Sequence, residues 1–443
     1  MNPPALPPEL PPSVEPPPVP TPAQPEQVAN SPVLVPVPRW RRILFFPVKY
    51  LVAVALTQSM FGAILLWGWA DRLVQRAVLR RWWKQSGSRG TQTFAEFCAS
   101  DSGTAAHRQW PNFITHEGFR EGGTRGWLSA LFAAFARNLR LGTQALCNTS
   151  ILLLPAGLLM WFGWYDGWQN SFNKGYENYA VGITISFIGI GWFIAAMFYM
   201  PMAQARQAVT GDWRAFWDGR VVRAVARERW LAGLLFAALI SLLAVPCNVM
   251  KSWPMFQMNV QPAVQDFTDA QALKWLNDYF FACGFSFVLY YVLVRLAGAR
   301  LYAGGLVAAV RNGRIAGSQL HETERVALER LQLLHQQLPP ERPFALRVAR
   351  WGASTFGRGV AGFALFWLWF SVIAQLYVNE FLHYHVAQGW LNQPLIQLPW
   401  FRYIPAKLDD PGGVLALTAA LVILISGVGR VGKMISNLRP RAQ

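Results

Sequence analysis

Residues 199–230, YMPMAQARQAVTGDWRAFWDGRVVRAVARERW, form the stretch that decides the fold of this chain. It carries six arginines and no lysine. On either side lies an uncharged apolar run of about twenty residues, the length that a helix needs to cross roughly 30 Å of hydrocarbon. We therefore interpret residues 199–230 as a basic connection between two membrane-spanning helices.

The composition of the whole chain agrees with this interpretation. Of its 443 residues, 53% are hydrophobic and 14% are charged, and a soluble fold could not bury so much apolar surface. Predicted spans cover residues 145–165, 180–200, 230–250, 279–298, 360–379 and 412–430, and a further apolar run covers 43–70. The predicted fold is an all-α polytopic transmembrane helix bundle of six to seven spans. Three in-out-in hairpins follow an N-terminal span or re-entrant segment, and interfacial amphipathic helices accompany them.

Proline, charge and apolar runs divide the chain into four regions. Residues 1–38 hold 15 of the 30 prolines and are predicted to be a disordered tail. Residues 39–90 comprise the first membrane segment with a basic interfacial helix, and residues 91–126 a polar cytoplasmic linker. Residues 127–443 form the bundle, with a basic cytoplasmic insertion at 299–359.

Positive charge is distributed asymmetrically along the chain. The formal net charge is +17, and the predicted topology places 31 of the 40 Lys and Arg residues on one side of the membrane. The positive-inside rule assigns that side to the cytoplasm, so a nucleic-acid partner is not needed to explain the charge. The side of the N-terminal tail stays open, because Arg39, Arg41 and Arg42 precede the run 43–70 and further basic residues follow it.

Two groups of arginines are candidate binding residues. Arg72, Arg76 and Arg80 recur every four residues after the first apolar run, and Arg214, Arg220, Arg223 and Arg227 lie in the basic connection. Positions 220, 223 and 227 share one face of a helix. Near anionic headgroups each basic residue contributes about 1 kcal/mol, so we expect these arginines to bind anionic membrane lipids or a protein partner.

Local signals predict how the basic connection folds. The predicted span 180–200 is expected to end at Pro201, and Gly211-Asp212 is typical of a turn followed by a helix N-cap. The acidic residues Asp212 and Asp218 could assist lipid-headgroup chemistry through a metal ion. Neighbouring arginines favour capping and ion pairing instead.

Three further patterns make testable structural predictions. Gly182 and Ser186 have the small-xxx-small spacing that permits tight helix contact, although a lipid-facing helix is an equal alternative. Arg295 lies near the inner end of a span, where it can snorkel to the interface. Residues 318–338 have the spacing of an amphipathic helix, either packed on its own bundle or in a short coiled coil.

Several motifs are better explained by their context than by chemistry. Residues 427–433, GVGRVGK, match parts of nucleotide-binding motifs, but an apolar run precedes them and Met434 stands where a hydroxyl residue is required. His383 and His385 lack further ligands, and the four cysteines form no CxxC pair. We expect no catalytic residue, no cofactor and no metal site.

A weak family resemblance accompanies the basic connection. A span that ends in proline, followed by TGDWRAFWD (residues 210–218) and a basic helix, resembles the recurring unit of a large class of bacterial multi-pass inner-membrane proteins of unknown function. The resemblance covers roughly residues 127–300. It implies an all-helical bundle in a bacterial inner membrane, and it implies no activity.

The sequence therefore predicts a non-enzymatic membrane scaffold or accessory module with a basic cytoplasmic face. The alternative is a transporter for a small neutral or amphipathic solute, because uncharged polar residues and the prolines Pro155 and Pro246 lie within the spans. An enzyme that acts on lipid is the third candidate.

Overall fold

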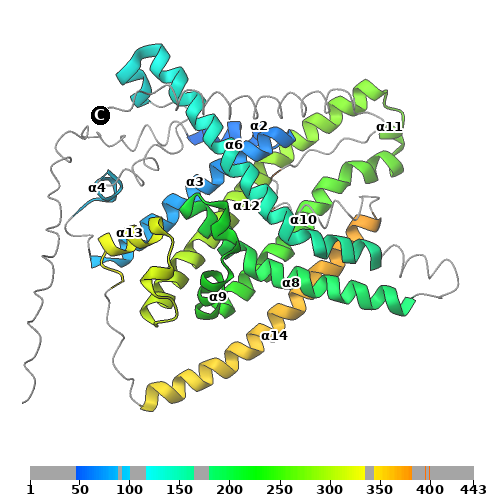
Figure 1. Cartoon of the computed structure of the whole chain (residues 1–443). Helices are drawn as coiled ribbons and strands as arrows, with labels where there is room; N and C mark the ends of the chain where they lie inside the picture. The colour runs from blue at the N-terminus through cyan, green and yellow to red at the C-terminus, as the bar shows by residue number, and fades with distance from the viewer. Residues whose placement is uncertain are drawn as a thin grey trace, which may run out of the picture. The chain divides into compact units, whose positions relative to one another are not determined.

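A computed structural model describes residues 46–87, 92–99, 116–163, 179–334 and 344–381, together with positions 395 and 399. The elements among these residues are all helical, and five helices are long and apolar enough to cross a membrane. The chain is thus an all-α polytopic helix bundle (Figure 1). The predicted span at 412–430 lies outside the described residues.

The helices follow one another in a simple order. They are α2 (Phe46–Leu56), α3 (Met60–Gln85), α4 (Phe94–Ala99), α6 (His116–Phe162), α8 (Tyr179–Thr210), η4 (Trp213–Trp217), α9 (Gly219–Glu228), α10 (Trp230–Val260), α11 (Pro262–Gln265), α12 (Asp269–Arg311), η5 (Gly317–Gln319), α13 (Glu322–Arg330) and α14 (Phe344–Phe381).

Five helices correspond to predicted spans: α6 to residues 145–165, α8 to 180–200, α10 to 230–250, α12 to 279–298 and α14 to 360–379. Each of these helices extends beyond at least one end of its predicted span. The prediction that the span 180–200 ends at Pro201 is wrong, because α8 continues through this proline to Thr210. Hydropathy detects only the part of a helix that suits hydrocarbon. The extensions of α8 and α12 are stabilised by packing against other helices.

The first apolar run, residues 43–70, is broken. Helix α2 ends at Leu56, and Ser59 caps α3 by accepting a hydrogen bond from the Gly62 amide at 3.0 Å. The 11 residues of α2 span about 16 Å, which is too short to cross a bilayer alone. A single continuous helix over this run is therefore excluded, and both alternatives for the side of the tail remain predictions.

Helices α3 and α6 cross with their backbones in contact. A β-carbon added at Gly68 would lie 1.8 Å from the Asn138 carbonyl oxygen, and one added at Gly142 would lie 1.9 Å from the Ile64 carbonyl oxygen. Only glycine permits this approach, since no side chain at either position could move aside from a backbone atom.

The alanine variant of Gly142 tests this crossing. We expect Gly142→Ala to lower the free energy of unfolding by about 1–3 kcal/mol, as overpacking usually does, despite the higher helix propensity of alanine. Thermal unfolding in detergent, followed by circular dichroism, measures the change. Gly352→Ala on α14 is the control, because nothing lies within 4 Å of its β-carbon position. Equal stability of the two variants would contradict the proposed crossing.

Close contact between α6 and α8 is confirmed. A β-carbon at Gly163 would meet the Ser186 hydroxyl at 2.4 Å and the Gly182 carbonyl at 2.8 Å, and one at Gly189 would meet Met160. The small residues of α8 therefore face another helix, and the lipid-facing alternative is wrong.

Helices α10 and α14 run parallel. Leu231 contacts Gly357 at the first turn of α10, and Ala238 packs with Ala364 and Leu368 farther along both helices. Parallel packing of the predicted spans 230–250 and 360–379 is what a regular alternation of in-out-in hairpins requires.

Beyond the most apolar parts of the spans, several helices build a second core that we call the helical cap. It consists of the C-terminal halves of α3, α8 and α12 with α4, α9 and α13 (Figure 1). Trp82 of α3 donates its indole N–H to the Ala303 carbonyl of α12 at 3.1 Å, and Gln75 donates to the Val209 carbonyl of α8 at 2.8 Å. These bonds hold the extended ends of the three helices together.

The predicted helix at 318–338 is wrong in its bounds. Helix α13 begins at Glu322, is capped by His321 and ends at Arg330, and Gln332 has a positive φ of 54°. The coiled-coil alternative is wrong as well, because Ala327 and Leu331 are buried in the helical cap. Packing on the same chain, the other alternative, is confirmed.

Candidate functional site

The part of the basic connection between α8 and α10 folds into two short helices, each capped by aspartate. Gly211 has a positive φ of 69°, which turns the chain after α8. Asp212 caps η4 by accepting from the Arg214 amide at 2.9 Å, and Asp218 caps α9 by accepting from the Arg220 amide at 3.3 Å. The predicted turn and N-cap are confirmed, and α9 has its own cap at Asp218.

Helix α9 has one buried face and one exposed face. Val221, Val222 and Val225 are buried against the helical cap. Exposed positions on the other face carry Arg220, Arg223 and Arg227, as predicted. An interfacial helix would place its apolar face in lipid. The valines of α9 instead pack on the protein itself, so α9 does not bury its apolar face in lipid.

Exposed tryptophans lie beside these arginines. Trp213 and Trp217 of η4 are 46% and 40% exposed, and the Arg214 guanidinium lies 5.7 Å from the centre of the Trp213 ring. We call Arg214, Arg220, Arg223 and Arg227, together with Trp213 and Trp217, the arginine face.

The predicted arginine stripe on α3 is only partly on the surface. Arg80 is exposed and Arg76 is half-buried, but Arg72 is buried and donates to the Asn138 side chain of α6 at 3.2 Å. Arg72 therefore cannot lie against lipid headgroups as predicted. Steps of four residues wind slowly around a helix, and at Arg72 this winding turns the stripe toward α6.

Beneath the arginine face lies a buried ion-pair cluster centred on Arg206 of α8. Its guanidinium contacts Asp218 at 2.7 Å and Glu324 of α13 at 3.3 Å, and the Tyr302 hydroxyl donates to the same glutamate. Arg206 and Glu324 are 2% and 0% exposed. The sequence gives no sign of this cluster, because nothing in residues 199–230 shows that Glu324 lies nearby.

Asp218 pairs with Arg206, whereas the sequence placed Arg220 nearest to it. Burial alone raises the pKa of Asp218. The hydrogen bond and charge of Arg206, together with hydrogen bonds from two backbone amides, lower the pKa by more than burial raises it. The net pKa lies below the usual value of an aspartate, so Asp218 stays ionised and holds α9 on α8.

Asn148 of α6 fastens η4 from another side. Its amide donates to the Trp213 carbonyl at 2.8 Å and to the Gln207 side chain at 3.1 Å. Its carbonyl accepts from the Trp217 indole at 2.9 Å. One polar residue of a predicted span therefore positions both tryptophans of the arginine face.

A second buried ion pair joins Asp71 of α3 to Arg295 of α12. Arg295 donates to Asp71 and to Gln204 of α8, and Gln204 donates to Thr149 of α6 at 3.0 Å. The prediction that Arg295 snorkels to the interface is wrong, because its side chain is only 5% exposed and turns inward. Asp71 lies directly after the first apolar run, and nothing near it in the sequence indicates that Arg295 is its partner.

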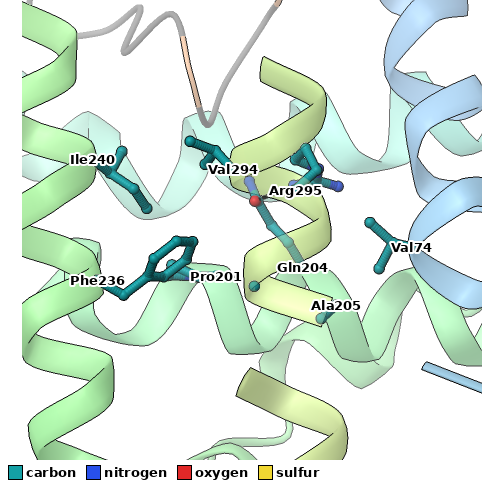
Figure 2. Close-up of a pocket in the computed structure, with 9 residues that line it drawn as sticks. Val74, Pro201, Gln204, Ala205, Phe236, Ile240, Val294 and Arg295 are labelled. Carbon is teal, nitrogen blue, oxygen red and sulfur yellow. Dashed lines mark hydrogen bonds between the residues drawn. The ribbon is translucent and has the colours of Figure 1, made fainter. Parts of the chain in front are cut away.

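A small cavity lies against this second pair (Figure 2). Its volume is about 10 Å³, enough for one water molecule. Gln204 and Arg295 are the polar side chains of its lining, and apolar side chains of α3, α8, α10 and α12 supply the remainder.

The arrangement supports binding more readily than acid–base chemistry. Asp71, Asp218 and Glu324 each hold an arginine. Within the described residues no three His, Cys, Asp or Glu side chains are grouped to hold a metal ion. Residues 427–433, His383 and His385 lie outside the described residues.

Comparisons with known proteins found no match for this chain. No protein-family model matches it, and no match is found among curated proteins or among solved structures. The resemblance to a class of bacterial inner-membrane proteins therefore stays a prediction.

Proposed function

We propose that this chain is a non-enzymatic scaffold or accessory module of a bacterial inner membrane, with a cytoplasmic arginine face that binds anionic lipid headgroups or an acidic protein partner. The observation that carries the proposal is the construction of α9. Its valines are buried in the helical cap, and Arg220, Arg223 and Arg227 are exposed.

The arginine face is rigidly supported from below. Asp218 binds the buried Arg206, and Asn148 binds the backbone carbonyl of Trp213 and the indole N–H of Trp217. A surface that is ordered before binding loses less conformational entropy when the ligand arrives. This support favours a binding role over a merely solvated run of charges.

The position of the tryptophans favours lipid headgroups as the first ligand to test. Trp213 and Trp217 are exposed, and so is Trp230 at the first residue of the span α10. Indole rings concentrate at the membrane interface. The neighbouring arginines would then lie at headgroup level, where anionic lipids present phosphate.

The test replaces Arg220, Arg223 and Arg227 together by glutamine. Loss of about 1 kcal/mol per arginine predicts a fall in affinity for phosphatidylglycerol of up to roughly 100-fold at low salt. Native mass spectrometry of the purified protein, titrated with phosphatidylglycerol or phosphatidylcholine, measures the binding. Added salt should narrow the difference between variant and wild type.

A charge-matched control replaces Arg300, Arg311 and Arg325, which are exposed outside the basic connection. This variant should retain most of the affinity. An equal loss of affinity in both variants would show that binding depends on net charge and not on the arginine face. Unchanged affinity in the first variant would refute the lipid-binding proposal and leave an acidic protein as the partner to seek.

A second candidate function is transport of a small neutral or amphipathic solute. The buried Asp71–Arg295 pair favours it, because charged residues inside membrane bundles often mark a substrate path. Transport requires a conformation with a wider polar cavity than the water-sized one beside Arg295. Solute uptake into proteoliposomes that contain the wild-type protein, and no such uptake into protein-free liposomes, would favour this function over the scaffold.

A further inference from the structure

Trp217 of the arginine face is held in one orientation by the protein. Its indole N–H donates to the Asn148 side chain of α6 at 2.9 Å, and its ring packs edge-to-face on Phe216, with 5.1 Å between the ring centres. Phe216 is fully buried, and its carbonyl accepts from the Tyr199 hydroxyl of α8 at 2.5 Å. The ring of Trp217 therefore cannot turn without breaking contacts with α6 and with the rest of η4.

The part of Trp217 that reaches the surface is apolar. An indole has a single hydrogen-bonding group, its N–H, and here that group is directed inward to Asn148. Trp217 is nevertheless 40% exposed. Its side chain therefore presents the hydrocarbon and π surface of the ring to a ligand, and no hydrogen-bond donor.

The contact with Asn148 attaches Trp217 to a membrane span. Asn148 belongs to the part of α6 that is long and apolar enough to cross a membrane, and Ile151, three residues farther along this span, is 57% exposed. Arg214 and Arg220 lie three residues before and after Trp217, outside the spans. The ring is thus bonded to a helix with lipid-facing side chains and is flanked in the sequence by arginines.

We propose that the arginine face takes an intact membrane phospholipid, and that Trp217 is the fixed apolar anchor of this site. The arginines bind the phosphate, and the ring of Trp217 packs against the glycerol and the first acyl carbons of the same lipid. A headgroup phosphate without acyl chains supplies only the first of these contacts. This inference rests on the proposed lipid binding and identifies the residue that requires an acyl chain.

Replacing Trp217 by alanine and by phenylalanine separates the ring from its hydrogen bond. Both variants remove the bond to Asn148, and only Trp217→Phe keeps an apolar ring. We expect Trp217→Ala to bind phosphatidylglycerol roughly 10-fold more weakly than the wild type, because it loses the apolar contact of the ring. Trp217→Phe should stay within about threefold of the wild type. Native mass spectrometry of the purified protein, titrated with phosphatidylglycerol, measures both affinities.

Trp192→Ala is the matched control. Trp192 of α8 is 47% exposed, and its indole N–H also has an acceptor, the Leu152 carbonyl at 2.9 Å. It lies within the predicted span 180–200, outside the arginine face, so its loss should leave the affinity unchanged. Equal affinity of Trp217→Ala and Trp192→Ala would overturn the inference. An equal loss in Trp217→Phe and Trp217→Ala would also overturn it, because the effect would then come from the bond to Asn148.

The arginine variant distinguishes a failure of this inference from a failure of the proposed function. If the variant without Arg220, Arg223 and Arg227 keeps its affinity for phosphatidylglycerol, the headgroup proposal fails and the anchor fails with it. If that variant loses affinity and Trp217→Ala does not, headgroup binding stands and only the apolar anchor is wrong.

A competition experiment on the wild-type protein decides the matter if Trp217→Ala does not fold. Glycerophosphoglycerol carries the headgroup of phosphatidylglycerol without acyl chains. A large excess of it should displace little of the bound lipid, because it has no acyl carbons to contact Trp217. Displacement at concentrations similar to those of the lipid itself would overturn the inference.

Discussion

Replacing Asp71 by asparagine will destabilise the helix bundle by about 3–5 kcal/mol, the usual effect of removing one partner of a buried ion pair. The variant leaves the Arg295 guanidinium buried with Gln204 as its main partner. A charge in that position cannot reach water without moving α12 relative to α3. Unfolding in detergent, measured by the loss of helical circular dichroism, reports the change.

The double variant Asp71→Asn, Arg295→Gln is the decisive comparison for this pair. With both charges removed, no uncompensated charge remains, and the double variant should be more stable than Asp71→Asn alone. The interaction energy from this double-mutant cycle should exceed about 1 kcal/mol. Additive effects of the two substitutions would mean that Asp71 and Arg295 do not stabilise each other.

Replacing Glu324 by alanine will release α13 from the helical cap. The substitution removes the carboxylate that binds Arg206 and accepts from Tyr302, and both partners are buried. Breaking such a pair costs about 3–5 kcal/mol, most of it from the arginine left behind. Amide hydrogen exchange should accelerate most in α13, because Glu324 is its buried charged contact with α8.

Glu329→Ala on the same helix is the matched control. Glu329 is exposed, and its contact with Arg325 at 3.9 Å is a surface pair that contributes at most about 0.5 kcal/mol. Exchange in α13 should be nearly unchanged in this variant. A similar acceleration in both variants would show that α13 is held by its leucines and that the Glu324 contact adds little.

Much of the architecture could be predicted from local signals. Apolar runs located five long helices, and the spacing of Arg220, Arg223 and Arg227 predicted the exposed face of α9. Both depend only on residues near one another in the chain. Helix ends were predicted poorly, as Pro201 shows, because tertiary packing carries α8 beyond its apolar run.

The buried charges could not be predicted in the same way. Asp71 and Arg295 are separated by 224 residues, and Arg206 and Glu324 by 118. Each arginine looked like a surface residue, because arginine near the end of a span usually reaches water. No periodic pattern identifies which carboxylate will meet it.

The sequence by itself determined that this protein is a helical membrane bundle with a strongly basic connection, since the length of apolar runs and the spacing of charges are local properties. Only the tertiary structure decided which arginines are exposed and which hold the bundle together. Arg220 is exposed, while Arg72, Arg206 and Arg295 are buried with partners from other helices. The reason is physical: a buried charge is stable only beside its partner, and packing alone decides which partner is within reach.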